Sequence, residues 1–372
     1  MKKENKIFTV LLKGCKAFFC LLLAFLMLCS CENGEKKTSD DPKQDHSFEE
    51  SASDASSLKE ESLLSTPSKE SEKAPSDPSS PMPLPTDESP TETSPTSEPS
   101  DGTPYLQIEG DRQGTVAVWW WNKGHAAKAN RKKYLEFLQK NGVNEIYICW
   151  PDFKREHLAD FVKAAGERGI GVSLLSGDAS WIDPQNDGAD RVIDAFLAYQ
   201  QGAQQGERLL SLHMDVEPHQ LADFWSDQQN ILEKYADFVE KTAKKVRAQG
   251  ERIEWDIPFW FDGYTVREET PLLEHLAENA DTLCLMSYRD SAEAVLECSE
   301  KELEIGAKYG CRVVCGLETY SAEGDHVSFM EEGKGYMYGQ CKTLYGMLSK
   351  RCAPEKFGIA IHYLDTWFKM KD

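Results

Sequence analysis

The sequence predicts an α/β fold: a (β/α)8 TIM barrel preceded by a disordered linker. Short β-rich runs alternate with amphipathic stretches from Thr115 onward, and strict alternation implies parallel strands joined by right-handed crossovers. Eight such runs within about 250 residues match a (β/α)8 barrel. A doubly wound sheet is the alternative, but no glycine-rich phosphate-binding motif follows the first run.

The predicted strands are rich in Val, Ile and aromatic residues. They are Val116–Trp121, Val143–Trp150, Ile170–Ser176, Leu209–Glu217, Ile253–Phe261, Thr282–Tyr288, Arg312–Glu318 and Phe357–Tyr363. The stretches between them have helical apolar spacing. They are Ala126–Lys140, Arg155–Arg168, Ala189–Tyr199, Ala222–Ala248, Leu272–Glu278, Ala292–Tyr309 and Tyr336–Lys350. Several of these helices are followed by glycine, which is typical of a C-terminal cap. The eighth helix is expected to be short or missing, because only nine residues follow Tyr363.

The N-terminus has the composition of an export signal. Residues 1–30 combine several lysines with a 12-residue apolar run that ends in Leu28-Cys29-Ser30-Cys31. This pattern resembles a bacterial lipoprotein signal peptide. The resemblance implies that Cys31 is lipidated and holds the protein on the extracytoplasmic face of the bacterial cell membrane. An ordinary signal peptide or an uncleaved anchor is the alternative.

Residues 31–104 are predicted to form a disordered linker. Positions 32–104 contain 11 of the 17 prolines, 17 serines, and 18 acidic against 6 basic side chains. Low hydrophobicity with high charge cannot offset the entropy of ordering. Residues 105–372 are therefore expected to form one catalytic barrel domain. The formal net charge of −21 argues against a nucleic-acid partner, because phosphate binding needs clustered Lys and Arg.

Aromatic and polar residues gather at the predicted C-terminal ends of the strands, where the active site of such a barrel lies. This composition suits a sugar, because aromatic rings stack on apolar sugar faces while carboxylates and His bind hydroxyls. Alternatively, some of these aromatic residues only cover the end of the barrel and have a packing role. The residues expected to bind a carbohydrate substrate are Trp120, Trp150, Asp178, His213, Trp260, Asp290, His362 and Trp367.

The fourth predicted strand carries the strongest chemical signal. Its even positions are apolar, so its odd positions, which include His213, Asp215 and Glu217, are expected to point into the barrel. Acids and a His on that face are costly unless they are paired or functional. Two carboxyls this close can keep one protonated while the other stays charged. A structural ion network is one alternative. A metal site that also uses His219 is another.

This strand resembles the D-x-x-D-x-D-x-E signature of chitinase-like glycoside hydrolases, with Asp215 and Glu217 as its last two carboxylates. Met286-Ser287-Tyr288 is similar to the M-x-Y run of the same family. The resemblance implies that Glu217 protonates the glycosidic oxygen. It also implies that Asp215 positions the substrate's N-acetyl group, which attacks the anomeric carbon, and that Tyr288 hydrogen-bonds that group.

A second resemblance gives Glu217 the same role. Val216-Glu217-Pro218 and Glu318 fall where the retaining clan of cellulases and β-galactosidases carries its two catalytic glutamates, at the ends of strands four and seven. This resemblance implies that Glu217 is the acid/base residue and Glu318 the nucleophile of a double displacement. The two resemblances differ over the nucleophile.

The predicted function is therefore a membrane-anchored, extracytoplasmic, retaining glycoside hydrolase. We expect a poly- or oligosaccharide substrate, a monomeric chain and no cofactor. Two alternatives stay open. His213 replaces the inner Asp of the chitinase-like signature, and Arg289 stands where Asp follows Tyr; both departures favour a non-catalytic carbohydrate-binding lipoprotein. A metal-dependent deacetylase or amidase is the third possibility.

Overall fold

The computed structural model describes residues 114–150, 154–321 and 326–371. The predicted signal peptide, the lipidation site Cys31 and the predicted linker lie outside the described residues, as do the first positions of the predicted 105–372 domain. Within the described ranges, no helix combines the length and the apolar character needed to cross a membrane.

Eight parallel strands close into a barrel, which confirms the predicted fold class. The strands are β1 (Thr115–Trp120), β2 (Glu145–Cys149), β3 (Gly171–Ser176), β4 (Leu212–Met214), β5 (Ile253–Pro258), β8 (Thr282–Met286), β9 (Arg312–Glu318) and β10 (Phe357–His362). Their order around the barrel is β1-β10-β9-β8-β5-β4-β3-β2, and the pairing of β1 with both β2 and β10 closes it. Two short strands, β6 (Thr265–Val266) and β7 (Thr270–Pro271), form a separate antiparallel pair.

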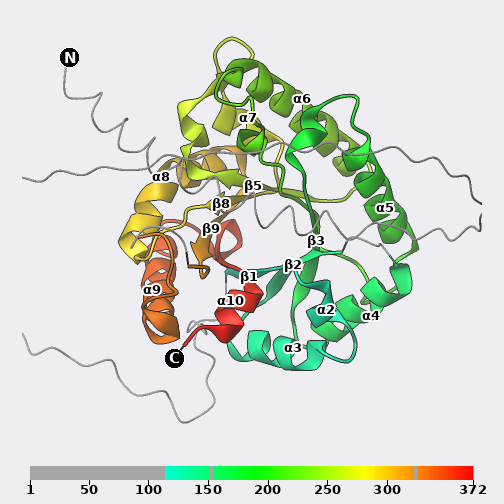
Figure 1. Ribbon diagram of the computed structural model, residues 1–372, viewed down its shortest axis with the longest axis vertical. Coiled ribbons are helices and arrows are strands. Elements are labelled where there is room, and N and C mark those ends of the chain that lie inside the picture. The colour runs from blue at the N-terminus through cyan, green and yellow to red at the C-terminus, as the bar shows by residue number, and fades with distance from the viewer. Residues whose placement is uncertain (1–113, 151–153, 322–325, 372) are drawn as a thin grey trace, which may run out of the picture. The chain divides into compact units, whose positions relative to one another are not determined.

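Helices surround the strands (Figure 1). They are α2 (Lys123–Ala126), α3 (Arg131–Lys140), α4 (Arg155–Gly166), α5 (Gly188–Gly202), α6 (Gln228–Arg247), α7 (Leu272–Glu278), α8 (Ala292–Tyr309), α9 (Gly333–Leu348) and α10 (Leu364–Lys369). The first predicted helix is in fact two, α2 and α3, and α6 begins six residues later than predicted. The eighth helix, α10, is short as expected. Gly142, Gly169, Gly250 and Gly310 have φ between 72° and 80°, as predicted for helix caps.

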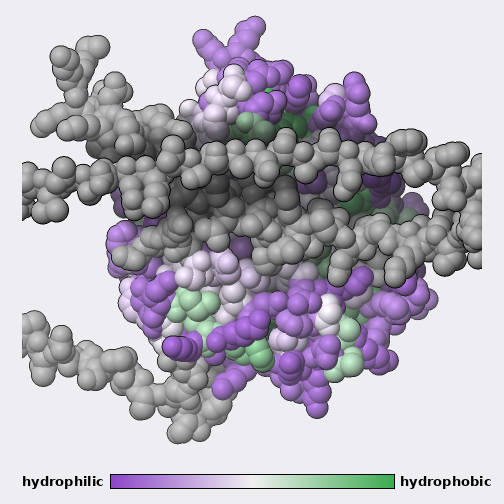
Figure 2. All heavy atoms as spheres, viewed as in Figure 1, coloured by the Kyte–Doolittle hydropathy of each residue, from purple (hydrophilic) through white to green (hydrophobic). Residues whose placement is uncertain are grey.

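The buried residues form two separate clusters, because side chains alternate between the two faces of a strand. The larger cluster lies between the strands and the helices and contains Trp120. The smaller one fills the barrel and contains Trp119, Tyr147 and Cys284. The visible surface of the described domain is mostly hydrophilic, with small hydrophobic areas (Figure 2).

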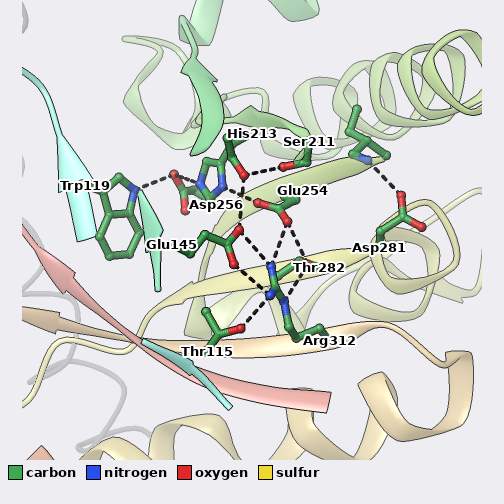
Figure 3. A network of polar contacts seen from close by, with 12 residues as sticks. Thr115, Trp119, Glu145, Ser211, His213, Glu254, Asp256, Asp281, Thr282 and Arg312 are labelled. Atoms are coloured by element: carbon green, nitrogen blue, oxygen red, sulfur yellow. Dashed lines mark hydrogen bonds and ion pairs between the residues drawn. The ribbon is translucent and has the colours of Figure 1, made fainter. Parts of the chain in front are cut away.

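The half of the barrel at the N-terminal ends of the strands holds a buried ion network (Figure 3). Arg312, at the start of β9, donates to both carboxylate oxygens of Glu145, at 2.9 and 3.2 Å, and to Glu254 at 2.9 Å. It also donates to the hydroxyls of Thr115 and Thr282. Each of these residues lies at or near the N-terminal end of its strand, so one guanidinium ties together strands β1, β2, β5, β8 and β9.

His213 extends this network toward the middle of the barrel. Its Nδ1 lies 3.0 Å from Glu254, and its Nε2 lies 2.9 Å from Oδ2 of Asp256, out of line for a hydrogen bond. Burial lowers the pKa of His213, but the charges of Asp256 and Glu254 outweigh burial and raise it to about 10. His213 is therefore a cation at neutral pH, paired with two carboxylates.

We expect Arg312→Met to destabilise the fold by about 3–5 kcal/mol, because it leaves the carboxylates of Glu145 and Glu254 buried without their cation. Arg351→Met is the matched control. Arg351 pairs with Glu300 at 3.0 Å, but both side chains are about half exposed, so its loss should change stability by about 1 kcal/mol or less. Urea unfolding of both variants measures the difference, and equal effects would contradict the stabilising role of the network.

Candidate functional site

The site forms where the chain leaves β4 at the C-terminal end of the barrel. β4 itself ends at Met214, and the Asp215 N–H still donates to the carbonyl of Ser176 in β3. A Cβ at Gly177 would lie 1.7 Å from the carbonyl oxygen of Asp215. Only glycine therefore allows the two segments to approach this closely. Two residues after Asp215, Glu217 immediately precedes the 3₁₀ turn η2 (Pro218–Gln220).

Turn η2 folds two side chains back onto the carboxyl group of Glu217. Gln220 donates to Oε1 at 2.5 Å. Nε2 of His219 lies 3.2 Å from Oε2, but out of line for a hydrogen bond. Glu217 is only 7% exposed. Its carboxyl group is therefore held at the rim, with one oxygen bonded and the other facing an imidazole.

Asp215 lies one inward position below Glu217 on the same segment. Although the residue keeps some exposure, its removal from water and the negative charges of Glu217 and Asp256 raise the pKa of Asp215 well above its usual range, against the opposing charge of His213. The protonated form of Asp215 is therefore favoured below Glu217.

The opposite part of the mouth is built around His362 at the end of β10. Its Nδ1 lies 2.9 Å from Oε2 of Glu318, and its Nε2 accepts from the indole of Trp121 at 3.3 Å. The ring of Tyr288 stacks on His362, with centroids 5.6 Å apart. A Cβ at Gly316 would lie 3.1 Å from Tyr288 and 3.4 Å from Trp119, so this glycine leaves room for both rings.

The charges at this wall are set by burial and by Glu318. Burial raises the pKa of Tyr288 well above its usual range, and Glu318 adds to the effect. Burial lowers the pKa of His362, but the charge and hydrogen bond of Glu318 outweigh it and raise that pKa. Tyr288 therefore stays a neutral phenol that can donate a hydrogen bond. Glu318 also accepts the backbone N–H groups of Thr319 and Tyr320, each at 2.7 Å.

An aromatic strip leads away from Glu217. Trp260, in the 3₁₀ turn η3 (Phe259–Gly263), meets His219 edge-on at 5.2 Å between ring centroids. Trp225 stacks beside Trp260 at 6.2 Å and an interplanar angle of 28°. Trp225 is 49% exposed. The strip thus starts at the residue that contacts Glu217 and ends at an open indole face.

Three of the predicted substrate-binding residues are wrong. Trp120, Trp150 and Trp367 are buried at 0–4% exposure. Trp120 and Trp150 both pack on Phe161 of α4, and Trp367 packs on Phe137 of α3. Side chains alternate between the two faces of a strand. Trp120 and Trp150 face the helices, whereas their neighbours in the chain face the barrel interior.

The prediction that His213 binds substrate is also wrong, because the residue is fully buried within the ion network. Asp178 is exposed beyond β3, where its Oδ1 caps the turn η1 (Ala179–Ile182) by accepting from Ser180 N at 2.8 Å. Asp290, beyond β8, is partly buried, and its carboxylate lies 3.9 Å from His326. The predicted roles of Asp178, Asp290, Trp260 and His362 in binding stay predictions.

One group of side chains could hold a metal ion among the described residues. His213, Asp256 and Cys284 bring one ligand atom each within 4.8 Å of one another. These groups already interact, since His213 bridges Glu254 and Asp256, and Asp256 accepts from Trp119 at 3.1 Å. Burial, then the charges of Asp256 and Glu254, raise the pKa of Cys284 well above its usual range, which disfavours the thiolate that a metal needs. The set fits an ion network better than a metal site.

A cavity of about 400 Å³ lies at the other end of the barrel, lined in part by Arg252, Tyr309 and Lys356. It is remote from the strand C-termini that carry Glu217, so we do not assign it to the same site.

Sequence reasoning missed Trp121, Gln220 and Trp225 as parts of the mouth, and it considered His219 only as a possible metal ligand. Trp121 could have been found by alternation, since it shares the inward face with Trp119. The partners of Glu217 carried a weaker signal, because the fold of a turn after a strand depends on tertiary contacts. The ion pair between Glu145 and Arg312 was also missed. Arg312 begins one predicted strand, and Glu145 is the third residue of another.

Comparisons with known proteins find similar solved structures. No protein-family model matches the sequence, and no curated protein matches it. Among solved structures, a family 18 chitinase from Pseudoalteromonas aurantia is 7% identical, with 68% of this chain and 94% of that chain covered and a TM-score of 0.46. A family 18 chitinase from Cycas revoluta in complex with (GlcNAc)3 is 12% identical, with 68% and 95% covered and a TM-score of 0.44. A chitinase from Chromobacterium violaceum is 12% identical, with 59% and 74% covered and a TM-score of 0.37.

Proposed function

We propose that this protein is a glycoside hydrolase that cleaves an oligo- or polysaccharide, with Glu217 as the acid/base residue. The observation that carries the proposal is the pair at the end of β4. A carboxyl at the rim of the barrel lies above a second carboxyl whose pKa is strongly raised. The raised pKa of Asp215 favours its protonated form and so places a proton beside Glu217, the arrangement that general acid catalysis of glycoside cleavage uses.

In the proposed reaction the proton passes from Glu217 to the glycosidic oxygen as the bond from that oxygen to the anomeric carbon breaks. A nucleophile forms a bond to the anomeric carbon as the leaving group departs. Water then attacks this carbon, the bond to the nucleophile breaks, and the Glu217 carboxylate accepts the proton that the water loses. The neutral phenol of Tyr288 and the carboxyl group of Asp215, whose pKa is raised, are suited to hydrogen-bonding a substrate group beside this carbon.

We propose that this nucleophile is the carbonyl oxygen of a substrate N-acetyl group. Glu318 is the alternative nucleophile, but both of its oxygens are occupied: Oε1 accepts two backbone N–H groups and Oε2 faces His362. Three N–H donors stabilise the carboxylate and reduce its tendency to attack carbon. The substrate is then an N-acetylhexosaminide, as the chitinase-like resemblance implies. Membrane attachment through Cys31 stays a prediction from the sequence.

Glu217→Gln should lower turnover of an N-acetylhexosaminide by at least about 100-fold, because the amide cannot donate the proton. Oligosaccharide binding, measured by calorimetry, should persist. Glu300→Gln, on the exposed face of α8, is the control and should retain full activity. Unchanged turnover in Glu217→Gln would remove the proposal. A wild-type chain that binds oligosaccharides without cleaving them would instead support the non-catalytic alternative.

Glu318→Gln separates the two nucleophiles. With substrate assistance, turnover of N-acetylhexosaminides should fall by about 10-fold or less, since only the hydrogen bond to His362 is disturbed. With Glu318 as the nucleophile, turnover would be lost and plain hexosides would be substrates for the wild type. Rates on paired chromogenic N-acetylhexosaminides and hexosides measure both outcomes.

Trp225→Ala should weaken oligosaccharide binding by about 5- to 10-fold, the loss expected for one aromatic stacking contact. Tyr309→Ala is the matched control, because Tyr309 is also an exposed aromatic residue but lies at the opposite end of the barrel. Calorimetric titration with an oligosaccharide compares them. If both variants bind like the wild type, the strip of Trp260 and Trp225 is not a sugar platform.

A further inference from the structure

His219 occupies an unusual position for a histidine that is not itself at the reacting bond. Its side chain is 14% exposed and faces the one oxygen of Glu217 that lacks a hydrogen-bond partner within the described part of the chain. Its ring meets three aromatic rings, at centroid distances of 5.2 to 6.4 Å. They belong to Phe224, Trp260 and Phe261. The imidazole is thus held in an aromatic box with one nitrogen toward Glu217.

The other ring nitrogen decides which tautomer this box allows. Nδ1 of His219 is buried and has no hydrogen-bond partner among the described residues. A proton on Nδ1 would be a buried, unsatisfied donor, whereas an empty Nδ1 lone pair costs less. The surroundings therefore favour the tautomer with its proton on Nε2. That N–H lies 3.2 Å from Oε2 of Glu217.

The two oxygens of Glu217 are consequently not equivalent. Oε1 already accepts from Gln220 at 2.5 Å, so Oε2 is the oxygen free to carry the proton. When that proton leaves, the negative charge develops on a buried oxygen beside the His219 N–H. Catalytic hydrogen bonds are often poorly aligned in the free enzyme and tighten as charge develops. A rotation of the ring within its box would complete this one.

We propose that His219 is a positioning residue for Glu217: its Nε2–H stabilises the carboxylate that forms when Oε2 gives its proton to the leaving group. The proposal rests on the proposed function and deepens it. Because the hydrogen bond strengthens as the charge forms, it lowers the barrier of the chemical step more than it improves substrate binding. The other titratable groups around Glu217 are Asp215, Tyr235, Tyr288 and His362.

Two substitutions at this position separate the hydrogen bond from the packing. Phe in His219→Phe fills the aromatic box but has no donor, whereas the side-chain amide of Gln in His219→Gln places an N–H near the position of Nε2. We expect His219→Phe to lower kcat by about 10- to 100-fold, the range for a lost hydrogen bond to a charged group, with KM nearly unchanged. His219→Gln should stay within a few-fold of the wild type.

The pH profile gives a readout that a packing role would not move. In His219→Phe the carboxylate form of Glu217 loses a donor, so the acid form persists to higher pH and the basic limb of the kcat profile should shift upward by about one pH unit. His219→Gln should keep the wild-type limb. Equal profiles for the wild type and His219→Phe, or equal losses in both variants, would overturn the proposal.

A measurement without turnover distinguishes this proposal from the function on which it rests. Nitrogen-15 NMR of the histidine rings in the folded protein reports the tautomer, with His219→Phe identifying the signal. Protonation at Nε2 of His219 near neutral pH is expected, and protonation at Nδ1 would refute the positioning role even in an active enzyme. Failure of the wild type to cleave any glycoside would instead refute the proposed function.

Discussion

The fold and the site both depend on cations that pair with the negative charges of buried carboxylates inside the barrel. Glu145, Glu254 and Asp256 all point into the interior, where an unpaired charge is costly. Arg312 and the cationic His213 lie between them and neutralise most of that charge. Because one guanidinium bonds residues from several strands, the same contacts that make the interior tolerable also fix the relative positions of those strands.

This constraint reaches the mouth through aromatic side chains. Asp256 accepts from the indole of Trp119 at 3.1 Å, and Trp119 in turn meets His362 edge-on at 5.4 Å. His362 then links Glu318, Trp121 and Tyr288. The side chains at the floor of the candidate site are therefore connected to the ion network through Trp119. The positions of Tyr288 and Trp121 thus depend on buried charges that lie below the site.

Much of this architecture follows from local pattern, and the failures have a physical cause. Alternation placed Asp215 and Glu217 on the inward face, and β–α alternation predicted the barrel. The same rule, applied strictly, excludes Trp120 and Trp150 from the mouth, because their positions alternate with inward-facing ones and so face the helices. The sequence could not show that His213 pairs with Glu254 and Asp256, because that pairing joins neighbouring strands whose register is set by the closed barrel. Nor could it show that turn η2 returns His219 to Glu217.

His213, at the position where the chitinase-like signature has a carboxylate, does not remove the negative charge around the β4 pair. His213 is a cation, but Asp256 on the adjacent strand lies 2.9 Å from it, so the two residues form a charge pair rather than a net positive charge. Burial, Glu217 and Asp256 raise the pKa of Asp215 against the opposing charge of His213. Asp256, a carboxylate of β5, thus contributes to the raised pKa of Asp215 although position 213 is a histidine. This is why the departure from the chitinase-like signature at position 213 is compatible with acid catalysis at Glu217.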